Sequence, residues 1–137
     1  MNVDQSTIAK LSLPCKMSKK ILVIDDDEDI LDIIEIVLKD EGYQVIISRF
    51  GNVINEVLII QPDLILLDNR LAGTNGHDLC KTLKSEQLTS NIPVVMISAA
   101  NGLKQIAIYC GADNYIEKPF DIGYLCEVVA STLSKRV

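Results

Sequence analysis

The sequence predicts an α/β fold in which a doubly wound, five-stranded parallel sheet is flanked by five helices. Three observations lead to this class. Short, strongly apolar runs alternate regularly with amphipathic stretches, which is typical of successive βα units. Several runs are too uniformly apolar to have a solvated face, as expected for parallel strands covered on both sides. The length of 137 residues and the hydrophobic share of 48% are sufficient for one domain with a buried core.

The first two βα units occupy residues 19–60. KKILVID (19–25) is predicted to be a buried strand, and YQVIIS (43–48) is predicted to be the second strand. The helix between them ends at Gly42, and its periodicity predicts one buried face. That face is expected to contain Ile30, Ile33, Ile34, Val37 and Leu38. A second, short helix follows Gly51 and ends at about residue 60.

The third and fourth strands are expected at DLILLD (63–68) and IPVVMIS (92–98). Pro62 separates the third strand from the helix before it, because proline interrupts helical hydrogen bonding. The segment NRLAGTNG (69–76) is predicted to be a loop, and the stretch from His77 to about Leu88 is predicted to be the third helix.

The last part of the chain supplies two more helices and one strand. A short helix is expected over Leu103 to Cys110, and GADNYIEK (111–118) contains the fifth strand. A final helix is expected from Phe120 to about Ser134. Its inward-facing residues are predicted to be Leu125, Val128, Val129 and Leu133.

Charge and composition restrict the classes of partner and compartment. The formal net charge is −6, so nucleic acid is not expected as a partner. No apolar run is long enough to span a membrane, and the first 16 residues lack the features of a secretory signal. The four cysteines (Cys15, Cys80, Cys110 and Cys126) form no CxxC pair, and the chain has one histidine, so a zinc site is not expected. Reduced thiols and a cytoplasmic location are the expectation.

The domain organisation is expected to be simple. Residues 1–18 are predicted to be a flexible extension and residues 19–137 to be the folded domain, with no room for an additional output domain. Met17 precedes the first strand closely, so the natural start at Met1 and a start at Met17 both remain open.

Polar side chains collect where the predicted strands end. Asp25 and Asp26 end the first strand, and Asp68 ends the third. Ser98 and Lys118 end the fourth and fifth. In open α/β sheets the ligand site lies beyond the carboxyl ends of the strands, so these side chains are expected to lie together. Asp27, Glu28 and Asp29 are interpreted separately as a helix start, since acidic groups favour a helix N-terminus.

Such a group of carboxylates predicts a cation site. Two carboxylates about 4 Å apart repel by roughly 4 kcal/mol at an effective dielectric constant near 20. Oxygen ligands in a small hydrated site suit Mg²⁺, and Lys118 would supply a second positive charge. Carboxylate, divalent ion, ammonium and hydroxyl together suit phosphoryl transfer, with Asp68 as the nucleophile.

These motifs resemble the receiver domain of two-component response regulators over residues 19–135. ILVIDDDEDI resembles the acidic pair of the first strand, and PDLILLDNRLAGTNG resembles the phosphoacceptor loop. IPVVMISA resembles the hydroxyl strand, and GADNYIEKPF resembles the lysine motif with its aromatic switch residue. The resemblance implies a flavodoxin-like sheet with strand order 2-1-3-4-5 and a stand-alone, CheY-like signalling domain.

The resemblance also implies specific roles. Asp25, Asp26 and Asp68, with the backbone carbonyl of Arg70, would bind Mg²⁺. Asp68 would accept a phosphoryl group from a histidine kinase or histidine phosphotransfer protein. The remaining roles are phosphoryl binding by Ser98 and Lys118, a change of orientation at Ser98 and Tyr115, and a cis bond before Pro119. The domain would catalyse only its own phosphorylation and dephosphorylation, and signal to a protein target through a changed surface or an onward relay.

Two alternatives remain open. The runner-up is an aspartate-nucleophile phosphohydrolase, whose DxDx[TV] signature is matched by Asp25 and Asp27 but not by Asp29. The other is a receiver that docks without phosphorylation. Arg70 makes it possible, because it stands two positions after the phosphoacceptor, where it would pair with the phosphoryl group or hinder the attacking water. The segment between Ser98 and Gly111 is also short, which predicts a shortened fourth helix.

Overall fold

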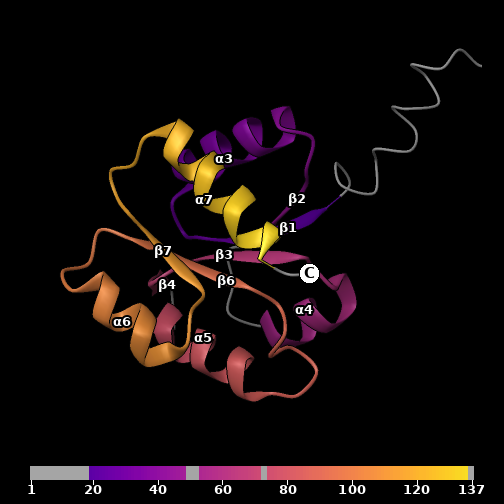
Figure 1. The fold of residues 1–137 in the computed structure, drawn as a ribbon, viewed down its shortest axis with the longest axis vertical. Helices are drawn as coiled ribbons and strands as arrows, with labels where there is room; N and C mark the ends of the chain where they lie inside the picture. The colour runs from indigo at the N-terminus through magenta and orange to yellow at the C-terminus, as the bar shows by residue number, and fades with distance from the viewer. Residues whose placement is uncertain (1–18, 49–52, 72–73, 136–137) are drawn as a thin grey trace, which may run out of the picture.

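The computed structural model describes residues 19–48, 53–71 and 74–135, so the predicted extension at 1–18 lies outside the described residues. Five parallel strands form one sheet in the order β2-β1-β3-β6-β7, which confirms the predicted order 2-1-3-4-5 (Figure 1). The strands are β1 (Lys20–Ile24), β2 (Gln44–Ser48), β3 (Leu64–Asp68), β6 (Val94–Ser98) and β7 (Asn114–Glu117). Every residue of β3 and β6 is buried, as their uniformly apolar sequences predict.

Helices cover both faces of the sheet. Within the described part of the chain they are α3 (Glu28–Asp40), α4 (Val53–Ile60), α5 (Gly76–Ser85), α6 (Leu103–Cys110) and α7 (Ile122–Ser134). Helices α3 and α7 lie on one face, and α4, α5 and α6 lie on the other (Figure 1). Alternate residues of β3 serve the two cores: Leu64 and Leu66 pack on the α3/α7 side, and Ile65 and Leu67 on the opposite side.

Helix α3 begins as predicted, and its buried face agrees with the predicted one in part. Asp27 is its N-cap and accepts hydrogen bonds from the amides of Asp29 and Ile30. Ile34 and Leu38 are buried as predicted, and Ile30 and Val37 are partly buried. Leu31 is buried without having been predicted, whereas Ile33, predicted to be buried, has 43% of its surface exposed. The apolar residues between 30 and 38 are too dense to define one stripe, and contact with the sheet selects the line through positions 31, 34 and 38.

The predicted loop at residues 69–76 contains regular structure. Arg70–Leu71 (β4) pairs antiparallel with Thr74–Asn75 (β5), and Leu71 is buried in the core on the α5 side. Strands of two residues are too short to leave a periodic pattern in the sequence, which is why only a loop was predicted. The pairing brings the start of α5 back towards the end of β3.

The other helix boundaries depend on local caps. Helix α6 has the predicted bounds, and it is flanked by Gly102 and Gly111 with φ values of 72° and 80°, a region that favours glycine. Helix α5 ends at Ser85 rather than near residue 88. Helix α7 starts at Ile122 rather than at residue 120, because Asp121 caps it by accepting a hydrogen bond from the amide of Gly123.

The inward face of α7 agrees with the prediction and contains one further, polar residue. Leu125, Val128 and Val129 are buried, and Leu133 is partly buried against the same core. Thr132, which was not predicted, is buried as well. The Thr132 hydroxyl donates to the carbonyl oxygen of Val128 at 2.6 Å. This hydrogen bond satisfies the hydroxyl inside the helix, so a polar residue can occupy an inward position that the apolar pattern does not mark.

Candidate phosphoacceptor site

A cleft of about 670 Å³ opens at the carboxyl edge of the sheet. Asp25 follows β1, Asp68 and Ser98 are the last residues of β3 and β6, and Lys118 follows β7. The strand register places these positions at one edge, since Ile24 pairs with Leu67 and Asp68 pairs with Ile97. The cleft is also lined by two more residues singled out from the sequence, Asp26 and Arg70. Six of the seven predicted site residues therefore lie together.

Lys118 is the cation that holds the two buried carboxylates. Its Nζ lies 2.9 Å from Oδ2 of Asp25 and 3.6 Å from Oδ1 of Asp68, and 17% of its side chain is exposed. The other oxygen of Asp25, Oδ1, accepts a hydrogen bond from the amide of Asp27 at 2.9 Å. The Asp25 side chain is fully buried, and each of its oxygens has a protein partner, as a buried charge requires. The Lys118–Pro119 peptide bond is cis, as the resemblance implied.

The environment of Asp68 raises its pKa from 3.8 to about 6. Burial is the largest cause, and the negative charge of Asp25 adds to it. The ammonium of Lys118 and hydrogen bonds from the amides of Asn69 and Arg70 act in the opposite direction without cancelling the effect. Positive charge is thus in deficit around Asp68, and a cation bound beside it would stabilise its ionised form.

The donor set of the cleft fits Mg²⁺. Asp25, Asp26 and Asp68 supply only oxygen atoms, and Asp26 is exposed to solvent, as suits an ion that keeps part of its hydration shell. Among the described residues, no group of three His, Cys, Asp or Glu side chains is compact enough to hold a metal by itself. Ligands beyond the carboxylates, such as a backbone carbonyl and water, would be needed to complete the coordination.

Ser98 and Tyr115 differ in their relation to the cleft. Ser98 is 1% exposed, and its Oγ accepts a hydrogen bond from the amide of Ala100 at 3.1 Å, so it lies at the cleft wall. Tyr115 is half-buried on β7 and does not line the cleft. It borders a separate hollow with Phe120 and Tyr124.

Two residues that the sequence did not single out hold the loop after Asp68. The carbonyl oxygen of Asn69 accepts from the amide of Gly76 at 2.8 Å, and its side-chain Oδ1 accepts from the amide of His77 at 3.0 Å. A Cβ atom on Gly76 would lie 2.1 Å from the backbone oxygen of Asp68, so this position requires glycine. The glycine at the predicted helix start was a visible signal, whereas nothing in the sequence pattern marks Asn69.

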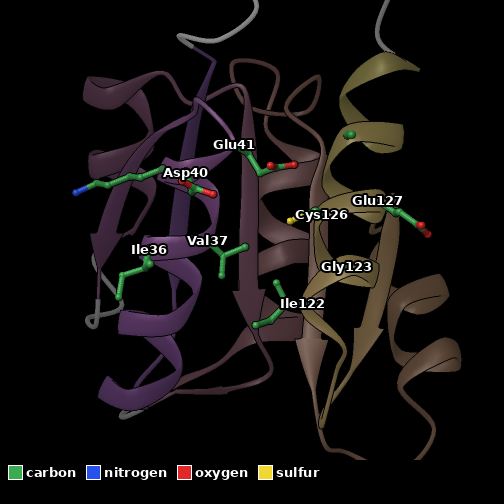
Figure 2. Close-up of a pocket in the computed structure, with 10 residues that line it drawn as sticks. Ile36, Val37, Asp40, Glu41, Ile122, Gly123, Cys126 and Glu127 are labelled. Atoms are coloured by element: carbon green, nitrogen blue, oxygen red, sulfur yellow. The ribbon is translucent and has the colours of Figure 1, made fainter.

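A larger groove lies elsewhere and contains none of the predicted site residues. It has a volume of about 990 Å³ and lies between α3 and α7, where Val37 and Cys126 point towards each other (Figure 2). Its lining combines apolar groups with the carboxylates of Asp40 and Glu41. Volume alone therefore does not locate the chemistry, which depends on the polar groups at the strand ends.

Replacing Lys118 by methionine is expected to lower the free energy of unfolding by about 3 kcal/mol at pH 7, the lower end for a broken buried ion pair, because two buried carboxylates lose their nearby ammonium. The loss of Lys118 also raises the pKa of Asp68 further. The loss of stability should be smaller at pH 5, because more of the Asp68 carboxyl is protonated and neutral there. Urea denaturation at both pH values measures it. An equal loss at both pH values would contradict the electrostatic explanation.

Three comparisons place these observations among known proteins. The sequence model of the response regulator receiver domain matches residues 21–130. A curated relative, the DNA-binding response regulator MtrA of Mycolicibacterium paratuberculosis, is 37% identical over 107 residues, which are 76% of this chain and 46% of the relative. The chain thus spans about half the length of this relative.

Solved structures give the same result for the fold. A putative response regulator from Chloroflexus aurantiacus superposes with a TM-score of 0.81 at 28% identity, covering 85% of this chain and 98% of the other. The receiver domain of a sensor histidine kinase from Pseudomonas aeruginosa has a TM-score of 0.74 at 23% identity, covering 85% and 98%. That protein holds a magnesium ion in its active site cleft. In the described part of this chain, no helix is long and apolar enough to cross a membrane.

Proposed function

Because this chain belongs to the response regulator receiver domain family, we propose that Asp68 is its phosphoacceptor and that the cleft at the strand ends carries out the phosphoryl transfer. The observation that supports this most directly is the position of Asp68. Its carboxylate is buried at the end of the central strand β3, beside Asp25 and 3.6 Å from the ammonium of Lys118. A nucleophile held in one geometry and flanked by charge-stabilising groups is what phosphoryl transfer requires.

Each residue of the cleft has a separate role in the proposed phosphoryl transfer. A carboxylate oxygen of Asp68 attacks the phosphorus atom of a phosphohistidine, and the bond from phosphorus to the imidazole nitrogen breaks as the new bond to oxygen forms. Lys118 neutralises charge on the phosphoryl oxygens, and the Ser98 hydroxyl donates a hydrogen bond to one of them. The amides of Asn69 and Arg70 keep the Asp68 carboxylate oriented. Tyr115 changes orientation once Ser98 is engaged.

Asp25, Asp26 and Asp68, with the backbone carbonyl of Arg70, would hold the Mg²⁺ ion. When bound, the ion supplies positive charge between the carboxylates and the incoming phosphoryl group. The raised pKa of Asp68 supports this role, since a cation at this position would favour the ionised nucleophile.

The domain is proposed to modify only itself and to act as a switch. Residues 19–137 would form the receiver, a histidine kinase or histidine phosphotransfer protein would supply the phosphoryl group, and an unidentified protein would read the changed surface. A cytoplasmic location agrees with the three free cysteines among the described residues. DNA binding is a property of the MtrA relatives, and the acidic charge of this chain does not favour it.

The alternatives are weaker for specific reasons. A phosphohydrolase of the DxD type would use Asp27 as its second acid, but the Asp27 carboxylate is engaged as the N-cap of α3. A receiver that docks without phosphorylation would not need Asp25, Asp68, Ser98 and Lys118 around one cleft.

Incubation with acetyl phosphate and Mg²⁺ tests the proposed function. Intact-mass spectrometry of the wild type is expected to show one phosphoryl adduct with Mg²⁺ and none when EDTA replaces it, because the ion supplies charge that the carboxylates need. Absence of the adduct from folded protein with Mg²⁺ present would contradict the proposal and would make Arg70, at the cleft wall, the first residue to replace.

Metal binding can also be measured without phosphorylation. Mg²⁺ is expected to raise the free energy of unfolding of the wild type, by about 2.7 kcal/mol when its concentration is 100 times the dissociation constant. Asp26→Asn should weaken this effect because Asp26 lines the cleft, whereas the exposed Asp32→Asn on α3 should preserve it. Urea denaturation over a Mg²⁺ series checks both variants, and an equal response in both would argue against the assigned ligands.

A further inference from the structure

The first turn of α5 is hydrogen-bonded to Asn69, the residue that follows Asp68. The amides of Gly76 and His77 belong to the start of a helix, where backbone N–H groups have no partner within the helix. Both donate to Asn69, one to its carbonyl oxygen at 2.8 Å and the other to its side-chain Oδ1 at 3.0 Å. Asn69 therefore satisfies two helix donors and is held through both its main chain and its side chain.

The imidazole of His77 adds a third contact. Its Nδ1 lies 2.9 Å from Oδ1 of Asn69. This atom of Asn69 is an oxygen and not the amide nitrogen, because it also accepts from the His77 amide. An oxygen acceptor requires a hydrogen on the facing ring nitrogen, so His77 carries its proton on Nδ1. The other ring nitrogen, Nε2, lies 3.7 Å from Asp78, and the ring meets Tyr109 of α6 edge-on.

These contacts bear on the phosphoacceptor through the backbone. The amides of Asn69 and Arg70 both hydrogen-bond to the Asp68 carboxylate. Any rotation of the Asn69 main chain would move these two amides relative to the carboxylate they hold. The Asn69 side chain, fixed by His77, resists that rotation.

We propose that His77 is a positioning residue for phosphoryl transfer to Asp68: through its Nδ1–H it holds Asn69, and through Asn69 it holds the two amides that orient the nucleophile. The inference rests on the proposed function of Asp68, and it gives a role to the single histidine of the chain. His77 does not line the cleft, so it acts through Asn69 and not on the phosphoryl group.

The test compares initial rates of phosphorylation by acetyl phosphate at saturating Mg²⁺. His77→Ala is expected to lower the maximal rate about fivefold, the effect of losing one hydrogen bond of ordinary strength. The Mg²⁺ concentration for half-maximal rate should not change, since the carboxylates remain in place. Urea denaturation establishes that each variant is folded.

Two amide variants separate positioning from general packing. Asparagine places an N–H donor at the same distance from the backbone as Nδ1, whereas glutamine places it one bond further, where Nε2 lies. His77→Asn is therefore expected to restore the rate to within about twofold of wild type, and His77→Gln is not. Asp78→Asn, which removes the carboxylate 3.7 Å from Nε2, serves as the matched control and should retain the wild-type rate.

A second readout does not depend on phosphorylation. In NMR spectra, the side-chain amide resonances of Asn69 should shift in His77→Ala and His77→Gln and should keep near-wild-type positions in His77→Asn. If the wild type is phosphorylated and His77→Ala is phosphorylated at the same rate, the inference about His77 is wrong while the proposed function stands. Equal rates for the asparagine and glutamine variants would also overturn it. Failure of the wild type to be phosphorylated would overturn both the inference and the proposed function.

Discussion

Replacing Asp68 with asparagine is expected to abolish the phosphoryl adduct and at the same time to stabilise the fold. The first effect follows because the amide oxygen is a poor nucleophile and cannot form the acyl phosphate. The second follows from burial and the repulsion between Asp68 and Asp25, which raise the pKa of Asp68 in the folded protein. The same change should therefore remove the reaction and strengthen the structure that supports it.

The stabilisation has a defined pH dependence. The pKa of Asp68 is about 6 in the folded protein, against 3.8 for an unperturbed aspartate. As the pH rises from 4 to 6 the unfolded chain releases this proton first, so the wild type loses stability over that interval. Each unit of pKa corresponds to about 1.4 kcal/mol, and the difference above pH 6 should be on the order of 1–3 kcal/mol.

Two measurements check the Asp68 variant. Intact-mass spectrometry with acetyl phosphate and Mg²⁺ should show no adduct on Asp68→Asn. Urea denaturation without Mg²⁺ should show the variant to be more stable than wild type at pH 7.5 and equally stable at pH 4. The exposed Asp32→Asn is the control and should behave as wild type in both assays. A phosphoryl adduct on the variant would assign the acceptor to another residue.

Gly76→Ala is expected to destabilise the protein by roughly 3 kcal/mol, at the upper end of the usual cost of overpacking. The new Cβ would lie 2.1 Å from the backbone oxygen of Asp68 and 2.8 Å from Cα of Asn69, and neither backbone atom can move without displacing the end of β3. The displacement would also misplace the Asp68 carboxylate, so phosphorylation should slow by an order of magnitude or more.

The matched control is Gly123→Ala near the start of α7. Its Cβ would meet only the Asp121 carboxylate at 3.7 Å, an ordinary contact. Because alanine favours a helix by up to about 1 kcal/mol over glycine, this variant should be as stable as wild type or slightly more stable. Urea denaturation and initial phosphorylation rates compare the two variants. Similar stabilities for both would show that the close approach at Gly76 is relieved by the chain.

Most of the fold could be predicted because its signals are strong and local. The three central strands β1, β3 and β6 are buried, mostly apolar runs. Helix α6 is bounded by glycines, so its limits were predicted correctly. The buried face of α3 was predicted only in part, since a helix with apolar residues around most of its circumference does not reveal that Leu31 is buried and Ile33 is not. Only packing against the sheet and α7 decides that choice.

The candidate site, like the fold, could be predicted only in part. Asp25, Asp68, Ser98 and Lys118 stand at strand ends, and the rule for parallel sheets brings such positions together. The contacts between Asn69, Gly76 and His77 could not be predicted, because they depend on the short β4–β5 pairing that returns the chain to the end of β3.

The arrangement of β3 has a consequence for how such a domain can evolve. Its apolar residues are divided between two cores, and only its last residue belongs to the cleft. Substitutions within the strand therefore act on folding alone, while a substitution at its end also acts on chemistry. A lineage can lose or retune its reactivity through one codon and still inherit an intact scaffold, which leaves that scaffold free to acquire other uses.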